Sequence, residues 1–113
     1  MAIGYRSVAD MAIQSTRTNV PDALTVYSQT ITSDDTAQAL DHKGRVLMAR
    51  LYASPTNGSP VYIGGSNVTS ALYTSKVTAD QYADITIDRL EKIYIYGKSA
   101  DTLMVTYFQG GDA

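Results

Sequence analysis

Histidine occurs once in this chain, at His42, so a histidine-based metal site or catalytic triad would need partners from distant parts of the sequence. His42 stands between Asp41 and Lys43-Gly44, a run that is typical of a turn at the surface. We therefore expect His42 to lie in a solvated turn rather than to act as a metal ligand or a general base.

The acidic residues also lack the spacing of a catalytic pair or a cation site. Asp84 and Asp88 share one face of a predicted strand, about 13 Å apart at roughly 3.3 Å per residue, which is too far for the carboxylates of a retaining glycosidase. A larger, inverting separation stays open once other strands are counted, but a solvated strand face explains the pair more simply. Asp34-Asp35 and Asp80 do not follow the Asp-x-Asp-x-Asp-Gly pattern of a calcium loop.

The glycine pair Gly64-Gly65 does not form a phosphate-binding loop, because it lacks the G-x-G-x-x-G spacing and precedes a β-prone run rather than a helix. We expect a tight hairpin turn there, with a positive φ at one of the two glycines. Cysteine is absent, which excludes thiolate ligands, a cysteine nucleophile and disulfides. The sequence therefore predicts no enzyme, no cofactor and no metal site.

Composition and charge limit the possible partners. The 113 residues carry a net charge of −2, and 44% of them are hydrophobic, as in one folded domain. No cluster of Lys and Arg marks a nucleic-acid surface. No apolar run has the length of a signal peptide or of the roughly 20-residue span of a membrane helix. We expect synthesis in the cytoplasm and no nucleic acid or membrane as partner.

Residues 1–22 differ from the rest of the chain, because their apolar residues have no regular spacing. One interpretation is a frayed terminus. The interpretation that we favour is an N-terminal arm that orders on a partner surface, since a solvated tail has little reason to carry so many apolar groups. Its expected anchors are Ile3, Tyr5, Val8 and Met11.

Residues 23–113 are predicted to form one all-β domain, a β-sandwich of the jelly-roll type. Apolar and β-branched residues alternate with polar ones, and the runs recur about every 8 to 12 residues with turn residues between them. Residues 36–40 fit either a helical turn or an edge strand, and residues 74–81 are expected to be a polar loop. Strands are expected at 24–32, 45–53, 61–63, 67–73, 82–87, 92–96 and 102–108.

The alternation also predicts which side chains fill the core. The run 45–53 is apolar on both faces, as in a central strand that is covered on each side. Asp84 and Asp88 should face solvent, opposite Ile85 and Ile87. The predicted core consists of Val46, Met48 or Leu47, Ile63, Ile85, Ile87, Ile93, Ile95, Leu103 and Val105.

Nine tyrosines accompany a single Phe and no Trp. Tyrosine provides rigid, amphipathic contact area and is enriched at protein interfaces. Tyr94 and Tyr96 should stand side by side on the outer face of their strand, and Met104 and Phe108 extend this stripe if the last two strands are neighbours. Three interpretations stay open, namely a solvent-facing pair, a subunit-contact stripe and an aromatic platform for a carbohydrate.

Two segments resemble a known family. Val61–Val68 (VYIGGSNV) and Leu90–Ile95 (LEKIYI) are similar to the "VYIGGSxV" hairpin and the later "L-x-K-I-Y-V" strand of small β-rich virion proteins of tailed bacteriophages, and the resemblance covers roughly residues 45–108. It implies a structural protein of the phage particle, such as a capsid decoration or cement protein, a head fibre, or a tail or baseplate component.

Together these observations favour a capsid decoration or cement protein that binds the major capsid protein on the exterior of the virion and stabilises the shell. Several weak contacts on one lattice give high avidity, and we expect a homo-oligomer, with a trimer first. The alternative from another class is a carbohydrate-binding module with Tyr94 and Tyr96 as its platform. The expected contact residues are Ile3, Tyr5, Val8, Met11, Tyr94, Tyr96, Met104 and Phe108.

Overall fold

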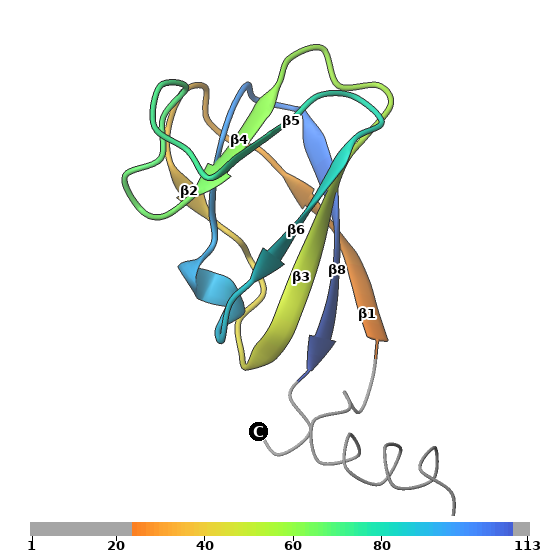
Figure 1. The fold of residues 1–113 in the computed structure, drawn as a ribbon. Helices are drawn as coiled ribbons and strands as arrows, with labels where there is room; N and C mark the ends of the chain where they lie inside the picture. The colour runs from red at the N-terminus through yellow and green to blue at the C-terminus, as the bar shows by residue number, and fades with distance from the viewer. Residues whose placement is uncertain (1–23, 110–113) are drawn as a thin grey trace, which may run out of the picture.

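A computed structural model describes residues 24–109, in which the strands form two antiparallel four-stranded sheets (Figure 1). The first sheet has the order β1-β8-β3-β6, made of β1 (Leu24–Thr30), β8 (Thr102–Gln109), β3 (Val46–Ala53) and β6 (Tyr82–Thr86). The second has the order β2-β7-β4-β5, made of β2 (Gln38–Ala39), β7 (Tyr94–Tyr96), β4 (Val61–Gly64) and β5 (Ser75–Val77). A short 3-10 helix, η1 (Leu90–Lys92), precedes β7.

Strand pairing follows a simple rule from the two ends of the described chain inward. β1 pairs with β8, β2 with β7, β3 with β6 and β4 with β5, all antiparallel. The chain is thus one long antiparallel ribbon that is rolled up until β8 also pairs with β3, and β7 with β4. Eight strands in two sheets with this order form a jelly roll. The predicted all-β sandwich is therefore confirmed.

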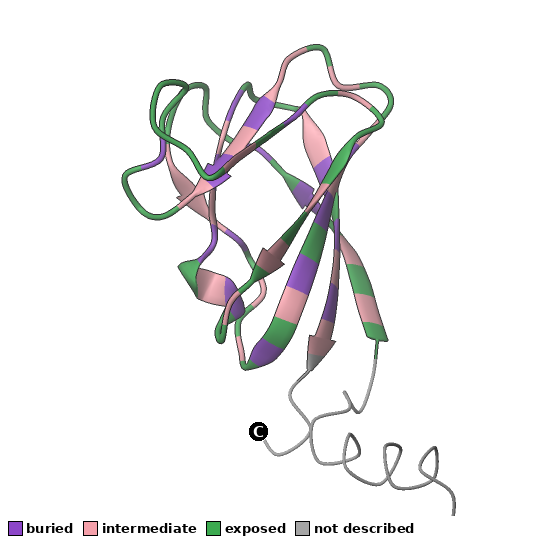
Figure 2. Cartoon of the chain, viewed as in Figure 1, coloured by how far each residue is buried: buried purple, intermediate pink, exposed green. Residues whose placement is uncertain are grey.

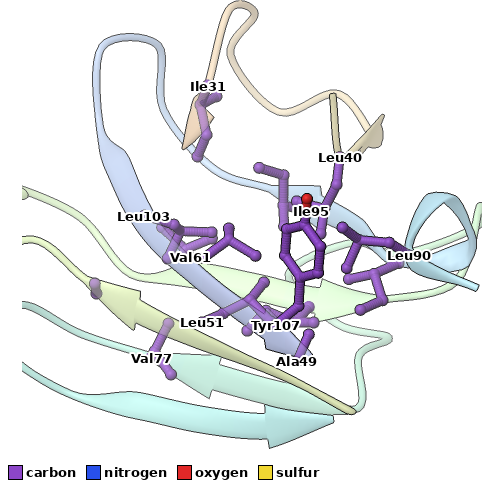
Figure 3. Packing of buried hydrophobic residues seen from close by; sticks show 14 of the residues in the cluster. Ile31, Leu40, Ala49, Leu51, Val61, Val77, Leu90, Ile95, Leu103 and Tyr107 are labelled. Carbon is purple, nitrogen blue, oxygen red and sulfur yellow. The ribbon is translucent and has the colours of Figure 1, made fainter. Parts of the chain in front are cut away.

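The core lies between the two sheets, because alternation turns one side of each strand inward. In β8, Leu103, Val105 and Tyr107 are buried while Met104 points outward, as predicted. Figure 2 shows buried stretches interspersed with more exposed ones along the strands. Burying each large aliphatic side chain contributes about 1.5–3 kcal/mol. The buried cluster, drawn in part in Figure 3, comprises Ile31, Leu40, Val46, Ala49, Leu51, Ala53, Val61, Ile63, Val77, Leu90, Ile93, Ile95, Leu103, Val105 and Tyr107.

Strand β3 differs from the expectation in two ways. Pairing of β3 with β8 is irregular between Val46 and Ala49, where β3 carries an extra residue. This bulge turns Val46 and Ala49 inward and leaves Leu47 40% exposed, so the placement of Leu47 or Met48 in the core is wrong. The outer face of β3 bears Arg50 and no described element covers it, which corrects the expectation of a strand covered on both sides.

Ile85 and Ile87 pack against the core but are only half-buried. The reason is their position on the edge strand β6 and just after it, where the sheet ends. The predicted facing of this segment is nevertheless right, because Asp84 and Asp88 are exposed.

The connection after β4 is longer than a tight hairpin. Residues 65–74 form an irregular loop of turns and bends rather than the expected strand at 67–73, and β5 lies inside the segment 74–81, for which the sequence predicts a loop. Gly44 is the described glycine with a positive φ, so the expectation for Gly64 or Gly65 is wrong. Gly64 is instead crowded, since a Cβ there would lie 3.2 Å from Val68 Cγ2.

The segment 36–40, whose sequence fits either a helical turn or an edge strand, contains the short strand β2. The predicted arm at residues 1–22, with Ile3, Tyr5, Val8 and Met11, lies outside the described residues, and its role stays a prediction. Residues 23 and 110–113 of the predicted domain also lie outside them.

Candidate functional site

The outward side of the β1-β8-β3-β6 sheet carries large apolar side chains. Leu24, Val26 and Met104 are 60%, 53% and 45% exposed. Leu24 lies opposite Phe108 in the β1-β8 pairing, so the two side chains are neighbours across the strands. With Met48 of β3, they form what we call the apolar outer face, defined as Leu24, Val26, Met48, Met104 and Phe108.

An ion pair borders this face. Arg50 donates two hydrogen bonds to Asp84, from Nε to Oδ1 at 2.7 Å and from Nη2 to Oδ2 at 3.0 Å. The Arg50 guanidinium thereby holds the pKa of the Asp84 carboxyl below its usual value, and it lies 4.0 Å from the centre of the Tyr82 ring. Together with Leu24, Met48, Thr106 and Phe108, the pair lines a shallow hollow of about 390 Å³.

The backbone of β1 is open on the side away from β8. The Ile31 N–H donates to the Asp101 carbonyl, and the Ile31 carbonyl accepts from the Ala100 N–H, each at 2.9 Å. The backbone N–H and C=O groups of the odd-numbered residues of β1 therefore point toward β8. The N–H and C=O groups of Val26 and Ser28 therefore point to the sheet edge, where no described strand pairs. An uncharged edge strand without proline is a template for pairing with another chain.

The four described residues of the predicted contact stripe do not share one face. Met104 and Phe108 lie on the apolar outer face, whereas Tyr94 and Tyr96 belong to β7 in the other sheet. The two sheets pack with their inner faces together, so their outer faces point in opposite directions. The expectation of one stripe is wrong because β7 and β8 are not neighbours. Whether each pair binds a partner stays a prediction.

The sequence pattern does not predict Leu24 and Val26 as contact residues. The signal was present, because both alternate with Thr25 and Tyr27 in a clear period-two run. The alternation alone does not indicate a contact surface, because only the pairing of β1 with β8 places these side chains beside Phe108.

His42 does not lie in a solvated turn, as its sequence context predicted, but is half-buried. Its ring stacks on Tyr27 with centroids 3.5 Å apart, and its Nδ1 lies 3.0 Å from the Tyr107 hydroxyl. Tyr27 donates to the buried Gln29 amide oxygen at 3.1 Å, and burial raises the pKa of Tyr27 to about 12. These contacts attach the loop after β2 to the first sheet.

Asp84 and Asp88 each form a separate ion pair. Asp88 pairs with Lys92 at 3.1 Å, as Asp84 does with Arg50, so each carboxylate has its own cation. Across residues 24–109, no group of three His, Asp or Glu side chains could hold a metal ion. No helix in that part of the chain has the length and apolarity to cross a membrane.

No protein-family model matches this chain, and no curated protein matches it. Among solved structures, a chain of the Bacillus endospore appendages, described as a novel family of disulfide-linked pili, matches with 15% identity and a TM-score of 0.40. The match covers 78% of this chain and 88% of that chain. Similarity at this level indicates nothing about function, and the present sequence has no cysteine with which to form a disulfide.

Proposed function

We propose that this protein is a structural component of a tailed-phage particle, where it binds the capsid exterior as a decoration or cement protein and stabilises the shell. The similarity of Val61–Val68 and Leu90–Ile95 to phage virion proteins supports the proposal that the protein belongs to a phage particle. The observation that carries the binding role is the apolar outer face, where Leu24 and Val26 are both more than half exposed beside the open edge of β1.

The physical argument starts from the cost of leaving this face in water. Monomeric proteins rarely expose contiguous apolar area of this kind unless a partner covers it. The apolar side chains of this face surround Thr106, and the Arg50–Asp84 pair, whose charges neutralise each other, lies next to them on the side of β6. Protein interfaces combine apolar area with polar groups in a similar way. The proposed occupants are the major capsid protein and sister subunits, and a repeated lattice lets small footprints add up to strong attachment.

The test is to add the purified full-length protein back to shells that were assembled without it. We expect it to sediment with the shells and to raise the temperature at which they rupture. Met104→Asp should weaken binding at least tenfold, because an uncompensated charge in a covered contact costs on the order of 2 kcal/mol or more. Leu72→Asp is the matched control, since Leu72 is 55% exposed in the loop between β4 and β5.

Equal binding of the parent and Met104→Asp would contradict the role of the apolar outer face. A cryo-electron microscopy map of the virion with this protein in the tail or baseplate would contradict the capsid location and leave the sandwich as a module of that other substructure.

A further inference from the structure

The outward side of the second sheet carries a row of tyrosine rings. Tyr62 of β4 lies opposite Tyr96 of β7 in the strand pairing, and their ring centroids are 6.2 Å apart in a T-shaped arrangement. Tyr73 extends the row, with its ring 5.0 Å from that of Tyr62. This surface is separate from the apolar outer face, because it belongs to the other sheet.

A groove of about 340 Å³ adjoins Tyr62 and Tyr96, and several loops contribute to it. Asp35 comes from the β1-β2 connection, Ser70 from the β4-β5 connection and Lys98 from the β7-β8 connection. Loops that are far apart in the sequence thus converge with two aromatic rings in one concave site, and its volume lies in the range of about 300–1,000 Å³ for small-ligand sites.

The polar side of the groove is held in place by hydrogen bonds within the fold. Lys98 Nζ donates to Asp35 Oδ2 at 2.8 Å, and the Asp35 N–H donates to the Gly97 carbonyl at 2.8 Å. Gly97 itself is buried, and a Cβ there would lie 2.8 Å from Ile31 Cδ1. A site that is formed before its ligand arrives loses less conformational entropy on binding.

We infer that this groove binds a neutral oligosaccharide. A pyranose ring has an apolar C–H face, which packs on an aromatic ring, and a rim of hydroxyl groups, which need donors and acceptors. Tyr62 and Tyr96 provide the aromatic surface, while the Asp35 carboxylate accepts and the Lys98 ammonium donates hydrogen bonds. The Asp35 carboxylate balances the Lys98 ammonium, and the Asp34 carboxylate also lies close enough to act on Lys98. The polar side therefore carries no excess positive charge, which favours an uncharged sugar over an acidic one.

The test uses the full-length protein in native gels that contain one soluble polysaccharide each, with dextran, mannan, galactan and xylan as neutral probes and alginate as the acidic probe. We expect slower migration in at least one neutral polysaccharide and none in alginate. Tyr96→Ala and Tyr62→Ala should each weaken that binding about tenfold, since each removes stacking area. Tyr82→Ala, an exposed tyrosine on the other sheet, should leave it unchanged.

Two further variants keep the test independent of folding. Tyr96→Phe preserves the ring and should bind within about threefold of the parent, because the aromatic face supplies the contact. Asp35 has a φ of 50°, a conformation that asparagine tolerates, so Asp35→Asn should fold normally and bind more weakly. Unchanged migration of the parent in all four neutral polysaccharides, retardation by alginate alone, or neutral-sugar binding that Tyr96→Ala and Asp35→Asn both leave intact would overturn the inference.

Discussion

Glu91 connects two parts of the chain that are far apart in sequence. Its Oε1 accepts from the Gly44 N–H at 3.0 Å, and its Oε2 accepts from Arg89 Nε at 2.7 Å. Gly44 has a φ of 130°, which a residue with a side chain rarely adopts. The two hydrogen bonds hold the pKa of Glu91 at about 2, with the Gly44 amide as the larger cause. One carboxylate thus attaches the turn before β3 to η1.

This pKa predicts a dependence of stability on pH. The folded-state pKa lies below the ordinary value of 4.5, so the contribution of Glu91 to stability is present above about pH 4.5 and is lost as the pH falls toward 2. We expect Glu91→Gln to lower the melting temperature at pH 7 and to approach the parent near pH 2. Circular dichroism melting at pH 7, 5, 3 and 2 measures the difference. A gap of constant size across this range would contradict the assignment.

Gly97 is restricted by packing rather than by its backbone dihedral. A Cβ at this position would lie 2.8 Å from Ile31 Cδ1 and 3.3 Å from the Pro60 carbonyl oxygen. We expect Gly97→Ala to destabilise the fold by about 1–3 kcal/mol, as overpacking does. Gly58→Ala is the control, because a Cβ there meets nothing within 4 Å. Urea denaturation measures the stability of both variants. Equal midpoints would show that the residues around Gly97 shift to accommodate the added Cβ.

At the scale of elements, β7 and β6 contribute differently to the core although both were predicted as strands with an apolar face. β7 lies between β2 and β4 and its Ile95 is fully buried. β6 is an edge strand, and its Ile85 is half-buried beside a hollow between the sheets. A strand in the middle of a sheet has neighbours on both sides, whereas an edge strand leaves one side of its residues open.

The loss of stability when these isoleucines are truncated to alanine should follow this difference. Ile95→Ala is expected to cost about 2–5 kcal/mol, because the surrounding core cannot collapse into the cavity. Ile85→Ala should cost roughly half as much or less, since part of its surface is already in water. Chemical denaturation of both variants against the parent gives the two free energies of unfolding. Equal losses would show that the edge of the sandwich is as tightly packed as its centre.

At the scale of the whole molecule, the apolar outer face predicts self-association. We expect the full-length protein to be an oligomer, with a trimer as the first expectation, because symmetric contact covers exposed apolar surface in every copy. Met104→Asp should shift the population toward monomers, and Leu72→Asp should not. Light scattering during size-exclusion chromatography measures the masses. A parent protein that stays monomeric at high concentration would contradict self-association through this face.

Local pattern was sufficient for much of this fold. The strands at Leu24–Thr30, Val46–Ala53, Tyr82–Thr86 and Thr102–Gln109 were predictable because alternation decides, residue by residue, which side chains turn inward. The sequence alone therefore determined an all-β sandwich, its inward residues in β8, and the presence of outward Met104 and Phe108.

Only the tertiary structure decided which strands became neighbours. The short polar segment Ser75–Val77 is a strand because β4 pairs with it, and His42 is half-buried because Tyr27 and Tyr107 meet it from other strands. The same cause separated Tyr96 from Met104 and joined it to Tyr62. Pairing between distant strands depends on how the whole ribbon rolls up, and a pattern with a period of two residues carries no information about that partner choice.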